Sequence, residues 1–332
     1  MSVSSGDAAG GRAAASGPLT FDGQVAVITG AGGGLGRAYA ELLARRGCRI
    51  VVNDVGLVHA GDRPVADEVV AGIDAAGGVA VADTHDVIDD GAAIVAAAVE
   101  AFGGVDIVIN NAGIGAGTPI GPDAVDEWRP TIDATLQGSI AVTGAAWPWL
   151  ESRGAGRVVM TSSCAMFGAS TTPPYSTAKS ALYGLTRSLA GQGRRSGIGV
   201  NAVMPSAYTR LTRSLPPGPM RDMFEADFPP ERVASFVAWL CHPSCEVSGE
   251  SFSVGGGRAA RVVLGENRGV RLDDDSDPAG WGALVDDLMA TDDVVFPRSM
   301  NDEVTWQAHT LGRPVPAELG PGGSLDWNRR PR

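Results

Sequence analysis

The sequence is short of aromatic residues, cysteines and cationic residues. Aromatic residues make up 6% of the 332, and the four cysteines stand at irregular spacing. Such a set in a chain of this size is not typical of a disulfide framework, so we expect reduced thiols and a cytoplasmic protein. The 38 acidic residues outnumber the 26 basic ones, and a formal net charge of −12 disfavours binding to nucleic-acid phosphates. We therefore expect no nucleic-acid partner.

Long apolar runs are also missing. No stretch approaches the roughly 18 to 20 apolar residues that a membrane span requires, so we expect no membrane partner. Residues 1–19 are mostly Ala, Gly and Ser, which predicts a disordered leader rather than a signal peptide. The segment from Cys241 to Cys245 holds one His and has no second ligand pair, so we predict no metal site.

The sequence does contain short apolar runs that alternate with helical segments. This alternation predicts an α/β fold, a single Rossmann-type doubly wound parallel sheet flanked by helices. We place this domain at residues 20–257, after the leader, and a C-terminal extension at 258–332 whose last ten residues are mobile. One long helix is expected over 126–153 and one amphipathic helix over 278–289. The proline-rich segment 206–230 follows a strand and is predicted to be an irregular substrate lid.

A glycine-rich turn follows the first predicted strand. The strand at 24–29 ends in Gly30-Ala-Gly-Gly-Gly-Leu-Gly36, and a helical segment comes next. Glycine is needed where the backbone turns sharply and approaches a pyrophosphate, which the N-terminus of a helix attracts. Asp54 ends the second strand, 20 positions after Gly34. A carboxylate there accepts hydrogen bonds from ribose hydroxyls and repels a 2′-phosphate, so NAD is favoured over NADP.

Tyr175 and Lys179 stand four residues apart and therefore share one face of a predicted helix. A nearby positive charge favours the phenolate and lowers the pKa of a tyrosine from its usual value of about 10. The pair predicts general acid–base chemistry, although such pairs also occur on exposed helices. Upstream, the strand that starts at 156 ends in Ser162 and Ser163, whose hydroxyls are candidates for a hydrogen bond to a substrate oxygen.

Four motifs in this order resemble the classical short-chain dehydrogenase/reductases. They are Thr29-Gly-x-x-x-Gly-x-Gly36, Asn110-Asn-Ala-Gly113, Thr161-Ser-Ser163 and Tyr175-x-x-x-Lys179. Residues 30–40, 51–54 and 239–246 further resemble the dehydrogenase module of the peroxisomal multifunctional enzymes of type 2. The likeness covers about residues 20–290. It implies an NAD-dependent oxidoreductase that interconverts a secondary alcohol and a ketone, on a 3-hydroxyacyl-CoA or hydroxysteroid-like substrate.

The resemblance also implies a role for individual residues. Tyr175 exchanges the proton, Lys179 lowers its pKa and holds the nicotinamide ribose, and Ser163 orients the substrate oxygen, with Ser162 as the alternative. The residues implied to contact the cofactor are Gly30, Gly34, Leu35, Gly36, Asp54, Asp86, Val87, Asn111, Ala112, Gly113, Tyr175, Lys179, Pro205, Ala207 and Thr209. Two further positions depart from the family: Thr135 replaces the Asn of a proton relay, and Ser206 replaces a Gly after Pro205.

Two other functions remain open at this stage. One is a ketoreductase that acts on a bulky polyketide or polycyclic ketone, and the other is a dinucleotide-binding sensor or scaffold that has lost catalysis. Arg210, Arg213 and Arg221 in the predicted lid are candidates for contacts to the phosphates of coenzyme A. Family members pair through their long helices, so the resemblance implies a homodimer or homotetramer.

Overall fold

The computed structural model describes residues 17–58, 63–115, 118–272 and 278–315. Within them one sheet forms the centre of the molecule, in the order β3-β2-β1-β4-β5-β6-β7-β8, and every neighbouring pair is parallel except β7 and β8. The strands are β1 (Val25–Thr29), β2 (Arg49–Asn53), β3 (Val79–Asp83), β4 (Ile107–Asn110), β5 (Arg157–Thr161), β6 (Gly199–Pro205), β7 (Ser251–Gly255) and β8 (Arg258–Val262). The predicted doubly wound fold is confirmed.

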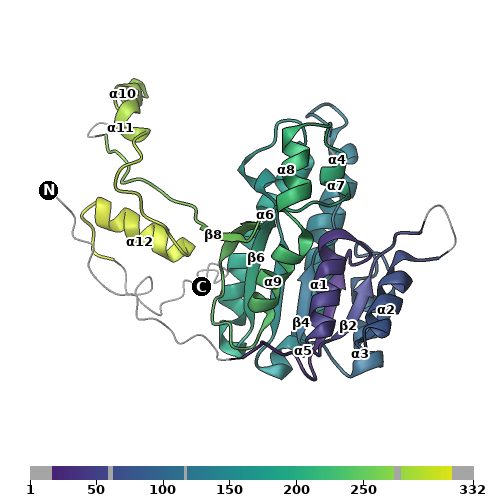
Figure 1. The fold of residues 1–332 in the computed structure, drawn as a ribbon. Coiled ribbons are helices and arrows are strands. Elements are labelled where there is room, and N and C mark those ends of the chain that lie inside the picture. The colour runs from purple at the N-terminus through teal and green to yellow at the C-terminus, as the bar shows by residue number, and fades with distance from the viewer. Residues whose placement is uncertain (1–16, 59–62, 116–117, 273–277, 316–332) are drawn as a thin grey trace.

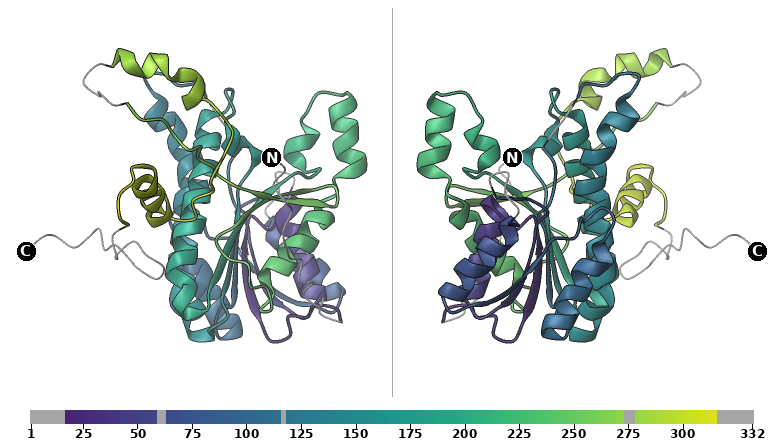
Figure 2. Two further views of the ribbon diagram at one scale, coloured as in Figure 1. Left: turned by 90° about the vertical axis from the view of Figure 1, so that its left-hand side faces the viewer. Right: turned by 90° about the vertical axis from the view of Figure 1, so that its right-hand side faces the viewer.

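Helices cover both faces of the sheet (Figures 1 and 2). They are α1 (Gly34–Arg45), α2 (Val65–Ala75), α3 (Gly91–Phe102), α4 (Ala124–Ile132), α5 (Gly138–Arg153), α6 (Pro173–Gly193), α7 (Arg210–Arg213), α8 (Pro219–Asp227), α9 (Pro230–Cys241), α10 (Ala279–Ala283), α11 (Val285–Leu288) and α12 (Met300–Thr310). Three short segments complete the set: the π-helix η1 (Asp133–Gln137) and the 3₁₀ helices η2 (Cys164–Phe167) and η3 (Arg194–Ser196).

The apolar residues of each strand alternate between two cores. In β1, Ala26 and Ile28 pack with α1, α2 and α9, whereas Val25 and Val27 pack with α3, α5 and α6. Alternate residues of a strand point to opposite faces, so a strand covered on both sides is apolar throughout. All five residues of β1 are buried accordingly. Packing on both faces holds the strands in place, and with them the polar residues that follow their carboxyl ends.

The predicted long helix over 126–153 is confirmed as one helical stretch, and a π-helical turn interrupts its α-helical pattern. It is divided into α4, the π-helix η1 and α5. A π-helical turn holds one residue more than an α-turn, which shifts the side chains that follow around the helix axis. Here it places the buried Thr135 toward Gly113.

The segment 206–230 is not irregular, since it contains α7 and α8. Both lie at the end of the sheet where the parallel strands terminate (Figure 1). Pro219 begins α8 and Pro230 begins α9. Proline is tolerated in the first turn of a helix because its missing N–H would have no partner there. Two of the prolines that suggested a loop therefore mark helix starts.

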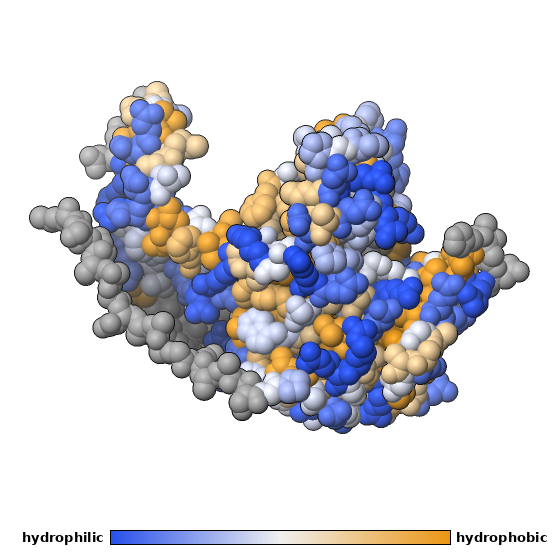
Figure 3. Space-filling view, in the orientation of Figure 1, coloured by the Kyte–Doolittle hydropathy of each residue, from blue (hydrophilic) through white to orange (hydrophobic). Residues whose placement is uncertain are grey.

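The C-terminal extension also differs from its prediction. Arg258–Val262, which we placed in the extension, forms β8 against β7, and the helix expected at 278–289 is divided into α10 and α11. Arg187 of α6 donates to the backbone oxygen of Pro297 at 3.0 Å, which ties the extension to the domain. Figure 3 shows apolar surface on the extension, where Leu264, Met289 and Phe296 are exposed.

Parts of the predicted boundaries lie outside the described residues. They are residues 1–16 of the leader and the last ten residues of the chain. Within the described part of the chain, no helix combines the length and apolarity needed to cross a bilayer.

Candidate active site

Helix α6 presents Tyr175 and Lys179 to the end of β5. Pro173 and Pro174 start the helix, so both side chains lie in its first two turns. The Nζ atom of Lys179 donates to the backbone oxygen of Thr161 at 2.5 Å and lies 5.6 Å from the centroid of the Tyr175 ring. Lys179 is buried, whereas Tyr175 is partly exposed. The structure thus brings together the phenol and the ammonium that the sequence pairs.

The two serines after β5 have different partners. Ser162 is buried, and its hydroxyl donates to the backbone oxygen of Lys179 at 2.7 Å. The Ser163 side chain is close enough to the Tyr175 hydroxyl to lower its pKa, and its Oγ accepts from the backbone N–H of Ala165 at 3.1 Å. Ser163 therefore lies beside the reactive phenol, while Ser162 fastens β5 to α6.

The electrostatic surroundings of the pair differ from the prediction. Burial is the largest influence on Tyr175 and raises its pKa, and the hydrogen bond from Ser163 partly offsets this. Burial also lowers the pKa of Lys179 to about 8. Desolvation disfavours the charged form of either group. The net shift of the Tyr175 pKa is thus opposite in direction to the lowering expected from the neighbouring Lys179.

The glycine turn follows β1 and opens α1. Gly30 and Gly34 have φ values of +61° and +53°, a region that favours glycine. A methyl group on Gly36 would lie 2.3 Å from the backbone oxygen of Gly30. Leu35 is partly buried in the first turn of the helix. Among the described residues no side chain caps this turn, so its N–H groups are available to an anion.

The motif after β4 holds the glycine turn in place. Asn111 Nδ2 donates to the backbone oxygens of Thr29 and Gly30 at 3.1 and 2.9 Å. The backbone N–H groups of Asn111 and Ala112 both donate to Thr29 Oγ1 at 3.0 Å. Asn111 and Ala112 therefore hold the glycine turn in place through these hydrogen bonds, whether or not they also contact a cofactor.

The residues predicted to hold the adenosine lie at the ends of β2 and β3. Asp54 accepts from the backbone N–H groups of Gly32 and Gly56 at 2.9 and 2.8 Å, which fixes its carboxylate beside the glycine turn. Asp86 accepts from Ile88 N at 2.9 Å, and Val87 is buried. A fixed carboxylate and an uncapped helix N-terminus fit a ribose diol and a pyrophosphate, so the site fits a nicotinamide dinucleotide.

The segment after β6 closes the other side of the glycine turn. A methyl group on Gly34 would lie 3.4 Å from Thr209 Cγ2. Thr209 caps α7 together with Thr212, and Pro205 and Ala207 lie at the strand end below it. The predicted nicotinamide contacts thus lie across the turn from the predicted adenosine contacts.

Thr135 lies beneath the tyrosine and lysine pair. It is fully buried, and within the described residues its Oγ1 has no hydrogen-bond partner. A methyl group on Gly113 would lie 3.0 Å from this oxygen and 3.4 Å from Lys179 Nζ. Gly113 therefore leaves room between the hydroxyl and the ammonium.

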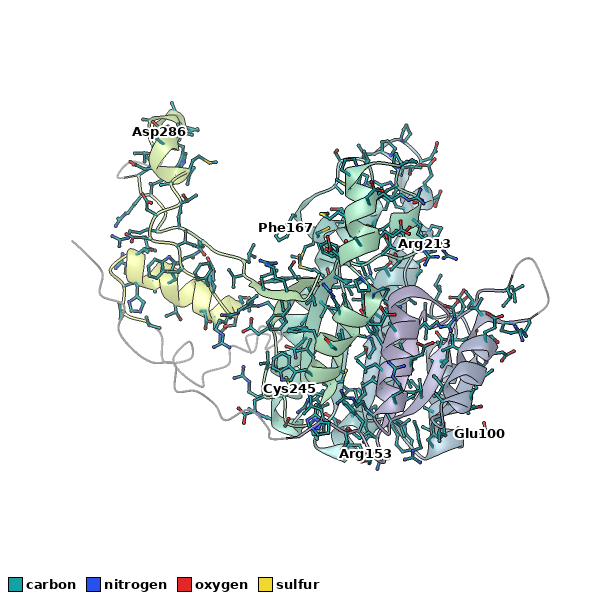
Figure 4. All side chains as sticks on the ribbon, in the orientation of Figure 1. Glu100, Arg153, Phe167, Arg213, Cys245 and Asp286 are labelled. Atoms are coloured by element: carbon teal, nitrogen blue, oxygen red, sulfur yellow. The ribbon has the colours of Figure 1, made fainter. Side chains whose placement is uncertain are left out.

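The mouth of the site carries both apolar and cationic side chains. Phe167 of η2 is 71% exposed and Met220 of α8 is 62% exposed. Arg210 and Arg213 are exposed on α7, and the Arg213 guanidinium stacks on the Tyr208 ring at 5.3 Å. Arg221 is partly exposed on α8. Figure 4 shows Phe167 and Arg213 at the end of the sheet where α8 lies.

A hydrogen-bonded cluster that the sequence motifs do not indicate lies beside Asp54 and is formed by Asn53, Asp83 and His85. The cluster could have been predicted from the polar residues at the ends of two strands, Asn53 in β2 and Asp83 in β3. Among the described residues, no three His, Cys, Asp or Glu side chains are placed to hold a metal ion.

The comparisons with known proteins agree with this geometry. A family model described as short chain dehydrogenase matches residues 24–217. The chain is 40% identical over 77% of its length to peroxisomal multifunctional enzyme type 2 of Drosophila melanogaster, and it spans 43% of that protein. It is 37% identical over 73% of its length to a hydroxyacyl-CoA dehydrogenase of Mycobacterium tuberculosis, 80% of which is covered.

A solved structure of the full-length Drosophila enzyme superimposes with a TM-score of 0.75 at 31% identity, covering 89% of this chain and 50% of that one. The chain thus spans about half of the multifunctional relative. The family model alone covers more than half of this chain. The chain therefore belongs to the short-chain dehydrogenase/reductase family, whose members are nicotinamide-dependent oxidoreductases.

Proposed function

We propose that this enzyme uses NAD to interconvert the secondary alcohol and the ketone of a 3-hydroxyacyl-CoA or hydroxysteroid-like substrate. The observation that carries the reaction is the buried Lys179, whose Nζ lies 5.6 Å from the centroid of the Tyr175 ring, with Ser163 close to the phenol. The name of the similar hydroxyacyl-CoA dehydrogenase supports the acyl-CoA substrate class.

In the proposed mechanism, a nicotinamide dinucleotide held by the glycine turn and Asp54 would supply the hydride chemistry at the carbinol or carbonyl carbon. In reduction, the neutral Tyr175 hydroxyl donates its proton to the carbonyl oxygen. In oxidation, the Tyr175 phenolate takes the proton from the alcohol. Ser163 orients the same substrate oxygen, and the Lys179 ammonium stabilises the phenolate as it forms. The buried hydroxyl of Thr135 lies near Lys179, where it could take part in a proton relay to the ammonium.

The pH dependence should have opposite signs in the two directions. Burial raises the pKa of Tyr175, so the proton needed for reduction is present at neutral pH. We expect kcat/KM for alcohol oxidation to rise about tenfold per pH unit, up to the pH at which the Tyr175–Lys179 pair has lost one proton. Above that pH, kcat/KM for ketone reduction should fall. Initial rates from pH 6 to 10 in both directions measure this. Two flat profiles would contradict a proton transfer by this pair.

The choice of NAD rests on Asp54. Asp54→Ala removes a carboxylate that binds ribose hydroxyls and repels a 2′-phosphate. We expect the ratio of kcat/KM with NADP to that with NAD to rise about tenfold to hundredfold. Asp74→Ala, an exposed acid on α2, is the matched control. An unchanged ratio in Asp54→Ala would count against NAD specificity set by this residue.

The coenzyme A part of the proposal predicts a role for Arg210, Arg213 and Arg221. Replacing each by Glu should raise KM for a 3-hydroxyacyl-CoA about tenfold, because a phosphate then meets a carboxylate. A neutral hydroxysteroid should be unaffected. Arg45→Glu changes an exposed charge in the last turn of α1, at the opposite end of the sheet, and serves as the control. If KM changed equally for both substrates, the arginines would not be binding phosphates, and a substrate without phosphates would be favoured.

We also infer that the enzyme is a homodimer or homotetramer located in the cytoplasm. Oligomers are common in the family, and the exposed Ile140 on α5 supplies apolar surface. The four cysteines are free thiols, which supports a reducing compartment.

A further inference from the structure

Asn53, Asp83 and His85 form one cluster at the ends of β2 and β3. Asp83 Oδ1 accepts from Asn53 Nδ2 at 2.6 Å and from the His85 backbone N–H at 3.2 Å. Asp83 Oδ2 lies 2.8 Å from His85 Nδ1. Asn53 Nδ2 also donates to the His85 backbone oxygen at 2.8 Å. Asn53 and Asp83 are buried, whereas the His85 side chain is 50% exposed.

This cluster anchors the loop that carries the predicted adenine contacts. The loop starts after Asp83 and includes Asp86 and Val87. Its first residues are held through both the backbone and the side chain of His85. The backbone N–H of Asp54 donates to the backbone oxygen of Asp83 at 3.0 Å, so the cluster also contacts the residue predicted to bind the ribose. The position of the adenosine half of a dinucleotide thus depends on Asp83 and its partners.

The imidazole is held in a strongly acidic environment. The hydrogen bond and charge of Asp83 raise the pKa of His85, and Asp90 at the start of α3 adds to this effect. Asp54 at the end of β2 and Asp86 in the loop bring further carboxylates to this end of the sheet. An opposite charge favours the protonated imidazole, which moves its titration toward neutral pH.

We propose that Asp83 and His85 are positioning residues for the adenosine half of the bound dinucleotide, and that the protonated pair holds the loop in its binding geometry. The inference rests on the proposed function, because it needs a dinucleotide at this site. As the pH rises, His85 loses its charge and the ion pair with Asp83 becomes a hydrogen bond to a neutral ring. The loop is then held less firmly, and a cation near the anionic dinucleotide is lost.

The test is the affinity for NADH, measured by fluorescence titration from pH 5.5 to 8.5. We expect His85→Gln to bind about threefold more weakly than the wild type at pH 6 and equally at pH 8.5. His85→Arg should bind NADH as tightly at pH 8.5 as at pH 6, because the charge of its guanidinium does not titrate in this range. His309→Gln, an exposed residue of α12, is the matched control. Lys179 titrates in all of these proteins, so the differences between variants isolate His85.

A second readout needs no cofactor. In NMR titrations without cofactor, the ring of His85 should titrate at a higher pH in the wild type than in Asp83→Asn, because the carboxylate is its partner. A wild-type pH profile in His85→Gln, or an unchanged titration of His85 in Asp83→Asn, would overturn the inference while leaving the proposed function standing. If the wild type binds no NADH at any pH, the proposed function itself fails and this inference fails with it.

Discussion

Tyr175→Phe should lower kcat by about 10² to 10⁴-fold, because it removes the only hydroxyl that the proposed mechanism uses for proton transfer. The ring remains, so its packing beside Lys179 and the affinity for NADH should change little. Single-turnover kinetics with the alcohol substrate, together with a fluorescence titration of NADH, measure the two effects separately.

Tyr183→Phe supplies the matched control for this result. Tyr183 lies two turns further along α6, where its hydroxyl accepts from Arg187 at 3.0 Å. The control loses one hydrogen bond on the same helix and should keep nearly full activity. If Tyr175→Phe retained more than a few per cent of wild-type turnover, Tyr175 would not be the proton donor. If it bound NADH and failed only in turnover, a sensor that has lost catalysis would also be excluded as the function of the wild type.

Gly36→Ala should abolish NADH binding and destabilise the fold by about 1 to 3 kcal/mol. The added methyl group would meet the Gly30 oxygen at 2.3 Å and Asn111 Nδ2 at 2.7 Å. Neither neighbour can move freely, because Gly30 is part of the turn and Asn111 fastens that turn to β1. The clash therefore disrupts the pyrophosphate site itself. Thermal unfolding and NADH titration measure the two losses.

Gly33→Ala is the control at the same turn. Gly33 has an extended φ of −169°, and among the described residues nothing lies within 4 Å of an added methyl group. Its thermal midpoint should match that of the wild type. Equal midpoints and equal NADH affinities in the two variants would show that the close approach of Gly36 to Gly30 is unimportant.

The sequence predicted the parts of the fold that depend on local chemistry. A turn with two left-handed residues and one close backbone approach needs glycine at Gly30, Gly34 and Gly36, so its pattern is visible without a structure. Buried parallel strands likewise appear as short continuous apolar runs. The spacing of Tyr175 and Lys179 reports a shared helix face for the same reason.

Features that depend on distant contacts are harder to predict from the sequence. Ser162 and Ser163 are neighbours, and only the packing of α6 on β5 decides which one meets Tyr175. The π-helical turn at 133–137 adds a single residue, which an apolar period cannot reveal. The pKa of Tyr175 shifts opposite to the prediction because burial, which the sequence does not show, is the largest influence on it.

The antiparallel strand β8 has a consequence for solubility. It pairs along the whole of β7 from Ser251 to Gly255, so the parallel part of the sheet has no free edge on this side. The new outer edge is only five residues long and carries Arg258 and Arg261. Short, cationic edge strands resist the edge-to-edge pairing that leads to aggregation. Copies of this protein are therefore expected to associate through helix faces rather than by extending the sheet past β8.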